Sequence, residues 1–174
     1  MRSKTSFLVS SLVSVGLGAS DQLPLLYGDP ESVTVSGFNA GATFACMLQV
    51  ILSDTIKGAS CMKGAAFGTS NGQVRFVTED DIEDIVEEAT GRIDELELEG
   101  LVDPTQNLRD RAVIIYSGTQ MTNWRPENQR AAQKVFLEYM QPSDFIELVE
   151  IDEKNQYRAA YNNEILYTLL LLDT

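Results

Sequence analysis

The chain has 174 residues, with 26 acidic and 13 basic side chains, no histidine and a net charge of −13 at pH 7. This length suits one domain, and the apolar fraction of 44% is enough for a hydrophobic core. The negative charge argues against nucleic acids and anionic lipid surfaces as partners. The lack of histidine argues against a zinc site, and no motif in the sequence requires a metal or a cofactor.

Residues 1–19 have the pattern of a secretory signal peptide. Arg2 and Lys4 form a basic start, and an uncharged, largely apolar run over residues 7–18 follows it. We therefore expect a protein that is secreted or resides in the secretory pathway, with a mature domain over residues 20–174. A mitochondrial presequence is the alternative, because the segment contains no acidic residue. The apolar run is too short to predict a membrane span.

The stretch over residues 32–52 predicts a strand, a sharp turn and a buried helix. Strand-forming side chains alternate over residues 32–36, and residues 40–52 are uncharged and apolar on nearly every side. The turn between them has the form G-x-x-x-G, with Asn39 at its centre. A serine at that position is the nucleophile of an α/β-hydrolase elbow. Asparagine tolerates a positive φ better than most non-glycine residues, but its carboxamide is not an acyl nucleophile.

The two cysteines fall in neighbouring predicted elements. Cys46 lies in the predicted helix, and Cys61 lies in a strand predicted over residues 57–66. That strand is rich in small residues, as is typical of the middle of a sheet. One disulfide is therefore possible in an oxidising compartment, and two separate buried thiols are equally compatible with the sequence. Neither cysteine is expected to be catalytic, because no histidine is present to activate it.

An acidic segment follows over residues 79–103, with Arg92 as its only base. A helix is predicted from Thr78, where Asp81 three residues later resembles a capping box, to a stop at Gly91. Its apolar positions recur with the spacing of one buried stripe. We expect the acids to form a solvated face. A cation-binding face is the alternative, although the segment lacks the spacing of an EF-hand.

The second half of the chain continues to alternate between strands and helices. A near-continuous apolar run predicts a buried parallel strand at residues 111–118, and Pro126 suits the first turn of a helix. A further strand is predicted over residues 145–151, and a final helix over residues 159–172. This order indicates an α/β domain with about four mostly parallel strands and helices on both faces of the sheet.

With these elements the chain resembles the secreted polyhydroxybutyrate (PHB) depolymerases, an esterase branch of the α/β-hydrolases. The resemblance rests on an ordered set of stretches at residues 35–41, 52–59, 91–94, 102–108 and 113–119. It implies the hydrolase fold, and a serine, an aspartate and a histidine that cleave esters of short hydroxyacyl chains. The sequence is shorter than the family pattern, so we expect a shortened domain whose exposed sheet edge associates with a partner.

The resemblance also places the catalytic positions of the family. Its nucleophile falls at Asn39, its aspartate falls at Met121, and its histidine would follow the strand that ends near Ile151. None of the three catalytic side chains is present at these positions. The amide of Ala40 corresponds to one half of an oxyanion hole. We expect the remaining pocket to be lined by residues of the elbow and of the later strand, namely Phe38, Asn39, Gly118, Thr119 and Trp124.

The sequence therefore favours a secreted hydrolase-like domain that has lost catalysis and binds an ester, an acyl ligand or a partner protein. The first alternative is a residual esterase for short hydroxyacyl esters, with Ser36, Thr43 or Cys46 as nucleophile. This alternative is weaker, because Ser36 closes a strand and the other two residues pack in the predicted helix. The second alternative is an acidic secretory cargo protein that binds cations.

Overall fold

The computed structural model describes residues 28–70, 76–122, 124–140 and 145–152. The predicted signal peptide at residues 1–19 and the predicted final helix at residues 159–172 lie outside the described residues. Within the described ranges, strands and α-helices alternate along the chain.

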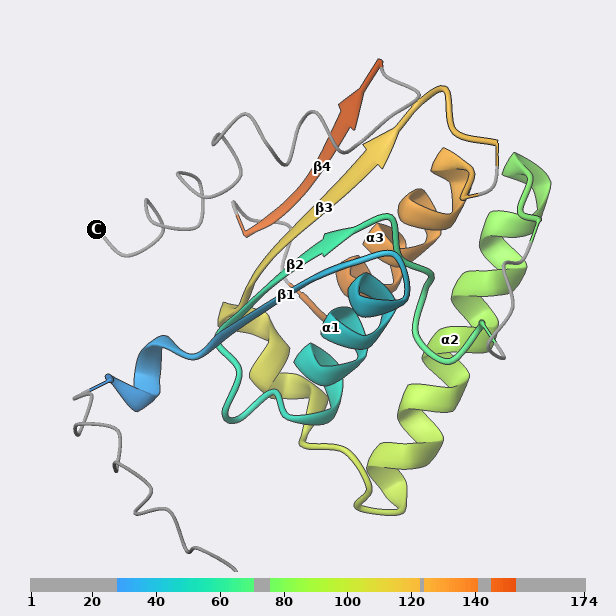
Figure 1. The fold of residues 1–174 in the computed structure, drawn as a ribbon. Coiled ribbons are helices and arrows are strands. Elements are labelled where there is room, and N and C mark those ends of the chain that lie inside the picture. Colours follow the sequence, from blue (N-terminus) through green and yellow to red (C-terminus); the bar gives the residue numbers. More distant parts are fainter. Residues whose placement is uncertain (1–27, 71–75, 123, 141–144, 153–174) are drawn as a thin grey trace, which may run out of the picture.

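Four parallel strands form one sheet in the order β1-β2-β3-β4 (Figure 1). Their bounds are Thr34–Phe38 for β1, Gly58–Met62 for β2, Ala112–Gly118 for β3 and Ile146–Ile151 for β4. The predicted α/β class with four parallel strands is confirmed. Because the strands are parallel, the residues that follow them all emerge at the same edge of the sheet, which we call the carboxyl edge.

Three α-helices connect the strands, namely α1 (Ala40–Ile51), α2 (Ile82–Leu98) and α3 (Pro126–Tyr139). All three lie on one side of the sheet, with α1 and α3 against the strands and α2 beside α3 (Figure 1). A sheet that adds each new strand at the same edge, through crossovers of one hand, keeps its crossover helices on one face. The described helices therefore do not include the cover of the second face that the sequence suggested. None of the helices in the described ranges is long and apolar enough to cross a membrane.

The main hydrophobic core lies between the sheet and the helices. One row of paired residues across all four strands contributes to it, namely Val35, Ala59, Val113 and Ile146. The opposite face of the sheet carries a smaller apolar cluster around Ile114 and Tyr116. The alternation of side chains along each strand separates the two clusters.

Helix α2 is longer than the sequence predicted. The predicted capping box is confirmed, because the amide of Thr78 donates to Asp81 Oδ2 at 2.7 Å and the Thr78 side chain caps the helix start. The predicted stop at Gly91 is wrong, since the helix continues to Leu98 and ends before Gly100, which has a φ of 69°. Ile93 is fully buried and extends the apolar stripe by one turn. Its burial offsets the cost of about 1 kcal/mol of a glycine inside a helix.

Helix α1 was predicted to be buried, and it is buried on one side only. Phe44 is 60% exposed and Leu52 is 42% exposed. The physical reason is the strand order, which puts β1 at an edge of the described sheet. Helix α1 packs over β1 and β2, and among the described residues it therefore has further secondary structure beside it in one direction only.

A disulfide joins α1 to the sheet. Cys46 of α1 is bonded to Cys61 of β2, with their Cα atoms 6.1 Å apart and a sequence separation of 15. Closing a loop of this size is expected to stabilise the fold by about 3 kcal/mol, because it restricts the unfolded chain. The bond holds α1 against β2, the strand that pairs with β1.

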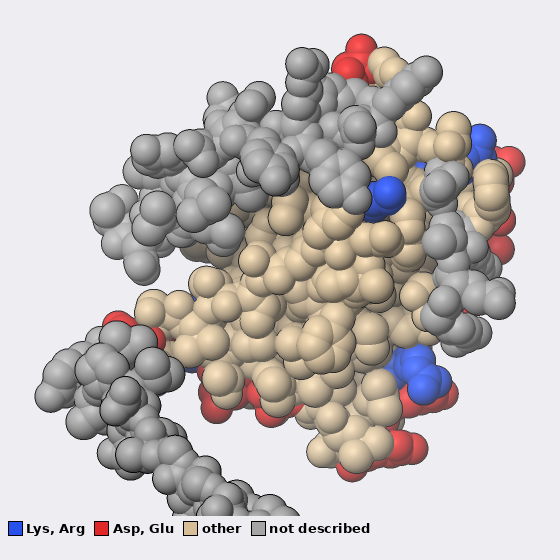
Figure 2. All heavy atoms as spheres, in the orientation of Figure 1, with Lys and Arg blue, Asp and Glu red and all other residues tan. Residues whose placement is uncertain are grey.

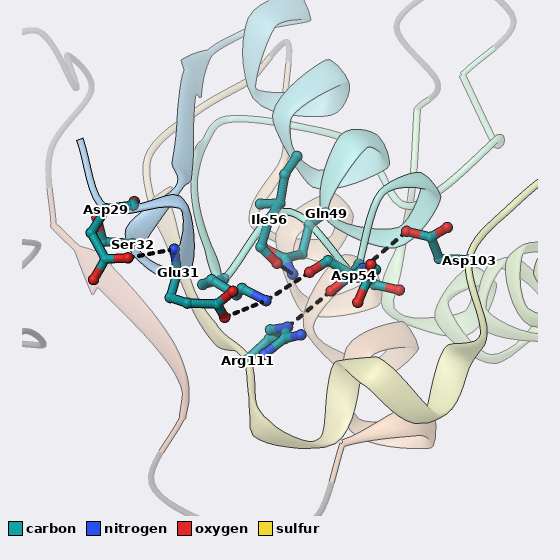
Figure 3. Close-up of polar contacts among 10 residues, drawn as sticks. Asp29, Glu31, Ser32, Gln49, Asp54, Ile56, Asp103 and Arg111 are labelled. Carbon is teal, nitrogen blue, oxygen red and sulfur yellow. Dashed lines mark hydrogen bonds and ion pairs between the residues drawn. The ribbon is translucent and has the colours of Figure 1, made fainter. Parts of the chain in front are cut away.

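Polar contacts at the opposite edge of the sheet connect the turn after α1 to β3 (Figure 3). The guanidinium Nε of Arg111 donates to the carbonyl of Ser53 at 3.0 Å, and the amide of Asp54 donates to Asp103 Oδ2 at 2.9 Å. These bonds satisfy backbone groups of the turn that follows α1. They fix the start of β2 and the start of β3 relative to α1.

The first turn of α1 lies against the end of β1 at a distance that only glycine permits. A Cβ atom at Gly37 would lie 2.0 Å from the carbonyl oxygen of Gly41 and 2.2 Å from its carbonyl carbon. Both of these atoms belong to the backbone, so they cannot move aside independently of the helix. A Cβ atom at Gly41 would meet no atom within 4 Å.

We predict that Gly37→Ala lowers the free energy of unfolding by about 3 kcal/mol or more, because the added methyl group forces the helix away from the strand. Urea denaturation followed by circular dichroism measures this change. Gly41→Ala is the matched control, and we expect it to raise stability by up to about 1 kcal/mol, since alanine favours a helix more than glycine does. Equal losses in the two variants would contradict the prediction.

Candidate functional site

Asn39 alone connects β1 to α1, and its backbone is strained. Its φ is 58° and its ψ is −121°. The left-handed helical region, where asparagine is tolerated, has a ψ near +47°. The strained, positive φ expected at Asn39 is therefore confirmed, but its ψ lies outside the left-handed helical region, and this conformation costs a non-glycine residue about 1–3 kcal/mol. The turn is also tighter than predicted, since β1 extends to Phe38.

The elbow presents polar groups at the surface. The amide of Asn39 donates to the Met62 carbonyl at 2.9 Å, and the Asn39 carbonyl accepts from the amide of Ala42 at 2.9 Å. The amides of Ala40 and Gly41, at the start of α1, have no acceptor among the described residues. Both of these residues and Asn39 are exposed. The positive end of the helix dipole and two unpaired amides therefore accompany an exposed carboxamide.

Lys63 lies beside the elbow at the carboxyl edge, and the sequence analysis missed it. It directly follows β2, with a φ of 66°. Its ammonium nitrogen lies 5.8 Å from the centroid of the Phe38 ring. Desolvation lowers the pKa of Lys63 from its usual value. The predicted strand over residues 57–66 hid this position, whereas a strand that ends at Met62 brings it to the carboxyl edge.

The loop that follows β2 is fixed by side chains from α1 and α3. The amide of Ala65 donates to Thr43 Oγ1 at 3.0 Å. The buried Gln129 donates from Nε2 to the Gly64 carbonyl at 2.8 Å, and its Oε1 accepts from Ser117 Oγ at 3.3 Å. Buried and mutually satisfied polar groups of this kind hold a loop in one conformation. The neighbouring elbow therefore has a rigid flank.

The end of β3 is tied to the end of β4. Gly118 is the buried last residue of β3, and Thr119 after it is exposed. Thr119 Oγ1 donates to Asp152 Oδ1 at 3.2 Å, and Gln120 Nε2 donates to the same oxygen at 2.7 Å. Asp152 is the first residue after β4, where the resemblance would place the approach to a histidine. Gln120 and Asp152 were not predicted as site residues, although their positions after two strand ends are a usable signal.

Met121 and Trp124 lie between other elements than Asn39 does. Met121 follows β3, which β2 separates from β1, so two strand spacings of about 10 Å in total intervene. The amide of Met121 donates to the Gly118 carbonyl at 3.2 Å, and Trp124 is buried just before α3. A hollow of about 720 Å³ lies instead between α1 and α2. None of the five expected pocket residues borders it.

The alternative nucleophiles have other roles in the structure. Thr43 is buried and accepts the amide hydrogen of Ala65, and Cys46 is bonded to Cys61. Ser36 is exposed in β1. Among the three alternative nucleophiles, Ser36 is therefore the one with a solvent-exposed side chain. The sequence contains no histidine to activate its hydroxyl.

Bases of α3 pair with acids of α2, of the short 3-10 helix before it (Glu79–Asp81) and of β4. Arg130 contacts Glu79 at 3.2 Å and Glu150 at 2.8 Å, and Lys134 pairs with Glu83. Within the described residues no group of three or more His, Cys, Asp or Glu side chains is arranged to hold a metal ion. Exposed pairs of this kind contribute little stability each, and they orient α2 against α3.

The comparisons with known proteins concern the fold. No protein-family model matches the sequence, and no curated protein matches it. The PHB depolymerase from Penicillium funiculosum superposes with a TM-score of 0.56 at 19% identity over 70% of this chain and 38% of the depolymerase chain. A serine-to-alanine PHB depolymerase variant in complex with an R3HB trimer gives the same values. The fold is that of an α/β-hydrolase.

This chain matches only part of that fold. It spans 38% of the length of the depolymerase chain that it matches. Esterase 2 from Thermogutta terrifontis is also similar, with a TM-score of 0.47, 17% identity and coverage of 83% of this chain and 58% of that chain. The structural neighbours are thus a PHB depolymerase and esterases at low sequence identity.

We predict that Asn39→Gly stabilises the protein by about 1 kcal/mol, because glycine adopts the backbone angles of this position without steric cost. Thermal and urea unfolding of the variant measure the change. Ala40→Gly is the control one residue further on, and we expect it to destabilise by up to about 1 kcal/mol as an ordinary helix substitution. Destabilisation by Asn39→Gly would mean that the Asn39 side chain contributes more than its backbone strain costs.

Proposed function

We propose that this chain is a secreted, catalytically inactive α/β-hydrolase-like domain that binds short hydroxyacyl esters or acids at its elbow. The observation that carries the proposal is Asn39, which stands at the strained connection between β1 and α1 where hydrolases present a serine. The elbow geometry is thus retained around a side chain that cannot act as an acyl nucleophile.

The loss of catalysis follows from chemistry. Ester hydrolysis through a hydroxyl needs a nearby base with a pKa close to neutrality to take the proton. Histidine is the usual base, and the sequence has none. Met121, at the position of the aspartate, cannot orient a base either. Removal of triad members costs on the order of 10⁴ to 10⁶ in rate, so three replaced positions leave only background hydrolysis.

Binding is the activity that the elbow can still support. The amides of Ala40 and Gly41 and the carboxamide of Asn39 are donors for a carbonyl or carboxylate oxygen. The ammonium group of Lys63 adds a positive charge at the same edge, beside the Phe38 ring. A depolymerase with this fold is known in complex with an R3HB trimer, which suggests hydroxybutyrate oligomers as the first ligands to test.

The compartment is part of the same proposal. A disulfide between Cys46 and Cys61 is typical of proteins that fold in an oxidising environment. This bond supports the secretory assignment suggested by residues 1–19 over the mitochondrial alternative. The acidic composition suits a soluble protein in such a compartment, because a net charge far from zero opposes self-aggregation.

We predict no hydrolysis of a short-chain acyl ester, such as p-nitrophenyl butyrate, above the buffer rate for the unmodified protein, Asn39→Ala or Asn39→Ser. The reason is that a serine restored at the elbow still has no base to take its proton. Release of p-nitrophenol measures the rate. Turnover by the unmodified protein that disappears in Asn39→Ala would contradict the inactive assignment.

We predict that a trimer of (R)-3-hydroxybutyrate binds, and that Lys63→Ala weakens its binding about tenfold through loss of the positive charge at the elbow. Isothermal titration calorimetry measures the dissociation constants. Lys57→Ala is the matched control, because Lys57 lies before β2 at the opposite edge of the sheet and pairs with Glu31. Absence of binding would remove the ligand from the proposal, and equal effects of the two lysines would remove the assignment of the site to the elbow.

A further inference from the structure

The outward side of α1 forms an apolar stripe that the described protein leaves open. Residues 32–53 contain no charged side chain. Ala42, Cys46 and Gln49 of α1 are buried. Phe44 and Leu48 of α1, and Leu52 directly after its last residue, recur every fourth residue at other positions. Phe44 and Leu52 are exposed and Leu48 is partly buried. A helix without charges on any side is normally buried by other elements all round. The stripe is therefore apolar but has no described element packed on it.

Strand β1 runs beside this stripe and is an edge strand of the described sheet. Thr34 and Ser36 are exposed, and the strand contains neither a charge nor a proline. Natural edge strands are usually protected against pairing by such residues. The other edge strand, β4, carries Glu147 and Glu150. The β1 edge is therefore the one that is open to pairing with another strand.

The surface around β1 and α1 is also free of charge. Figure 2 shows a broad uncharged face where these two elements lie in Figure 1, with acidic and basic groups around its rim. Most of the negative charge of the chain therefore does not oppose contact at this face. This surface combines the open edge of a strand with an apolar side of a helix. A partner that itself presents a strand and an apolar helix side would fit both features.

The few charges near the ends of β1 select the orientation of that occupant. Asp29 and Glu31 lie just before β1 (Figure 3), and Glu31 is paired with Lys57. Lys63 lies beyond the other end of β1, above the Phe38 ring. An antiparallel copy of β1 brings the basic end of each strand to the acidic end of the other. A parallel copy would bring like charges together.

We propose that a second copy of this chain occupies this face, in a dimer whose two β1 strands pair antiparallel about a two-fold axis at Ser36. The axis is perpendicular to the sheet, so it produces one continuous sheet with both copies of α1 on the same face. This assignment goes beyond the proposed ligand binding and does not depend on it. An isologous contact of this kind is the commonest form of protein dimer.

The dimensions of the two layers agree with this arrangement. Strands pair about 4.8 Å apart, so the axis lies about 2.4 Å from each β1. Because α1 packs over β1 and β2, its centre is offset from the axis by about one strand spacing. The two helices then lie about 10 Å apart, which is the upper end of the range for packed helices, 8–10 Å. The stripes of Phe44, Leu48 and Leu52 therefore meet across the axis.

The first test is a cross-link at the axis. In an antiparallel pair, residues directly opposite each other have Cα atoms about 4.5–5.5 Å apart, within the range of a disulfide. Ser36→Cys in the full chain is therefore expected to give a covalent dimer on mild oxidation, seen on a non-reducing gel. Thr119→Cys, at an equally exposed position after β3, is the matched control. No Ser36→Cys dimer, or equal cross-linking of both variants, overturns the proposal.

The second test uses the apolar stripe. The unmodified full chain is expected to sediment as a dimer at micromolar concentration, and Phe44→Glu is expected to raise the dissociation constant at least about tenfold by placing a charge at the centre of the contact. Leu98→Glu is the matched control, since Leu98 is 89% exposed at the end of α2. Circular dichroism checks that both variants remain folded. A monomeric unmodified chain, or equal effects of the two variants, overturns the assignment.

Discussion

The contact between Gly37 and the backbone of Gly41 is the constraint on which the rest of the molecule depends. Because no side chain separates them, α1 begins one residue after β1 ends, and Asn39 must make the whole turn. That geometry sets the position of α1 over β1 and β2. It also brings Cys46 within bonding distance of Cys61 and Thr43 within reach of the loop after β2. One steric contact thus organises the helix, the disulfide and the carboxyl edge.

The carboxyl edge is rigid in its construction, and the sequence contains no histidine that could serve as a base there. Gln129 and Thr43 hold the loop after β2, and Asp152 joins the ends of β3 and β4. Such fixed scaffolding is what catalytic sites require, and it serves equally well for binding. The backbone strain of this turn falls on Asn39, whose side chain is a carboxamide and not a hydroxyl. Strain of this kind persists only where the surrounding structure imposes it.

The strand order of the described sheet has a physical consequence. In the described chain the elbow strand lies at an edge of the sheet, so both β1 and α1 have neighbours on one side only. Apolar side chains such as Phe44 then face solvent, although their sequence is typical of a buried helix. A second copy restores the missing neighbour without adding any new element to the chain.

The sequence by itself determined the local features. Periodicity and capping located the strands and helices, and the glycine spacing around Asn39 identified the elbow, because these signals depend on neighbours within a few residues. Only the tertiary structure decided what depends on strand order: the exposed side of α1, the placement of Lys63 beside Phe38, and the separation of Met121 from Asn39. The extension of α2 past Gly91 belongs to the same group, since burial of Ile93 outweighs the local preference of glycine to end a helix. Sequence patterns fix which side of an element is apolar, whereas the arrangement of the elements decides whether anything covers that side.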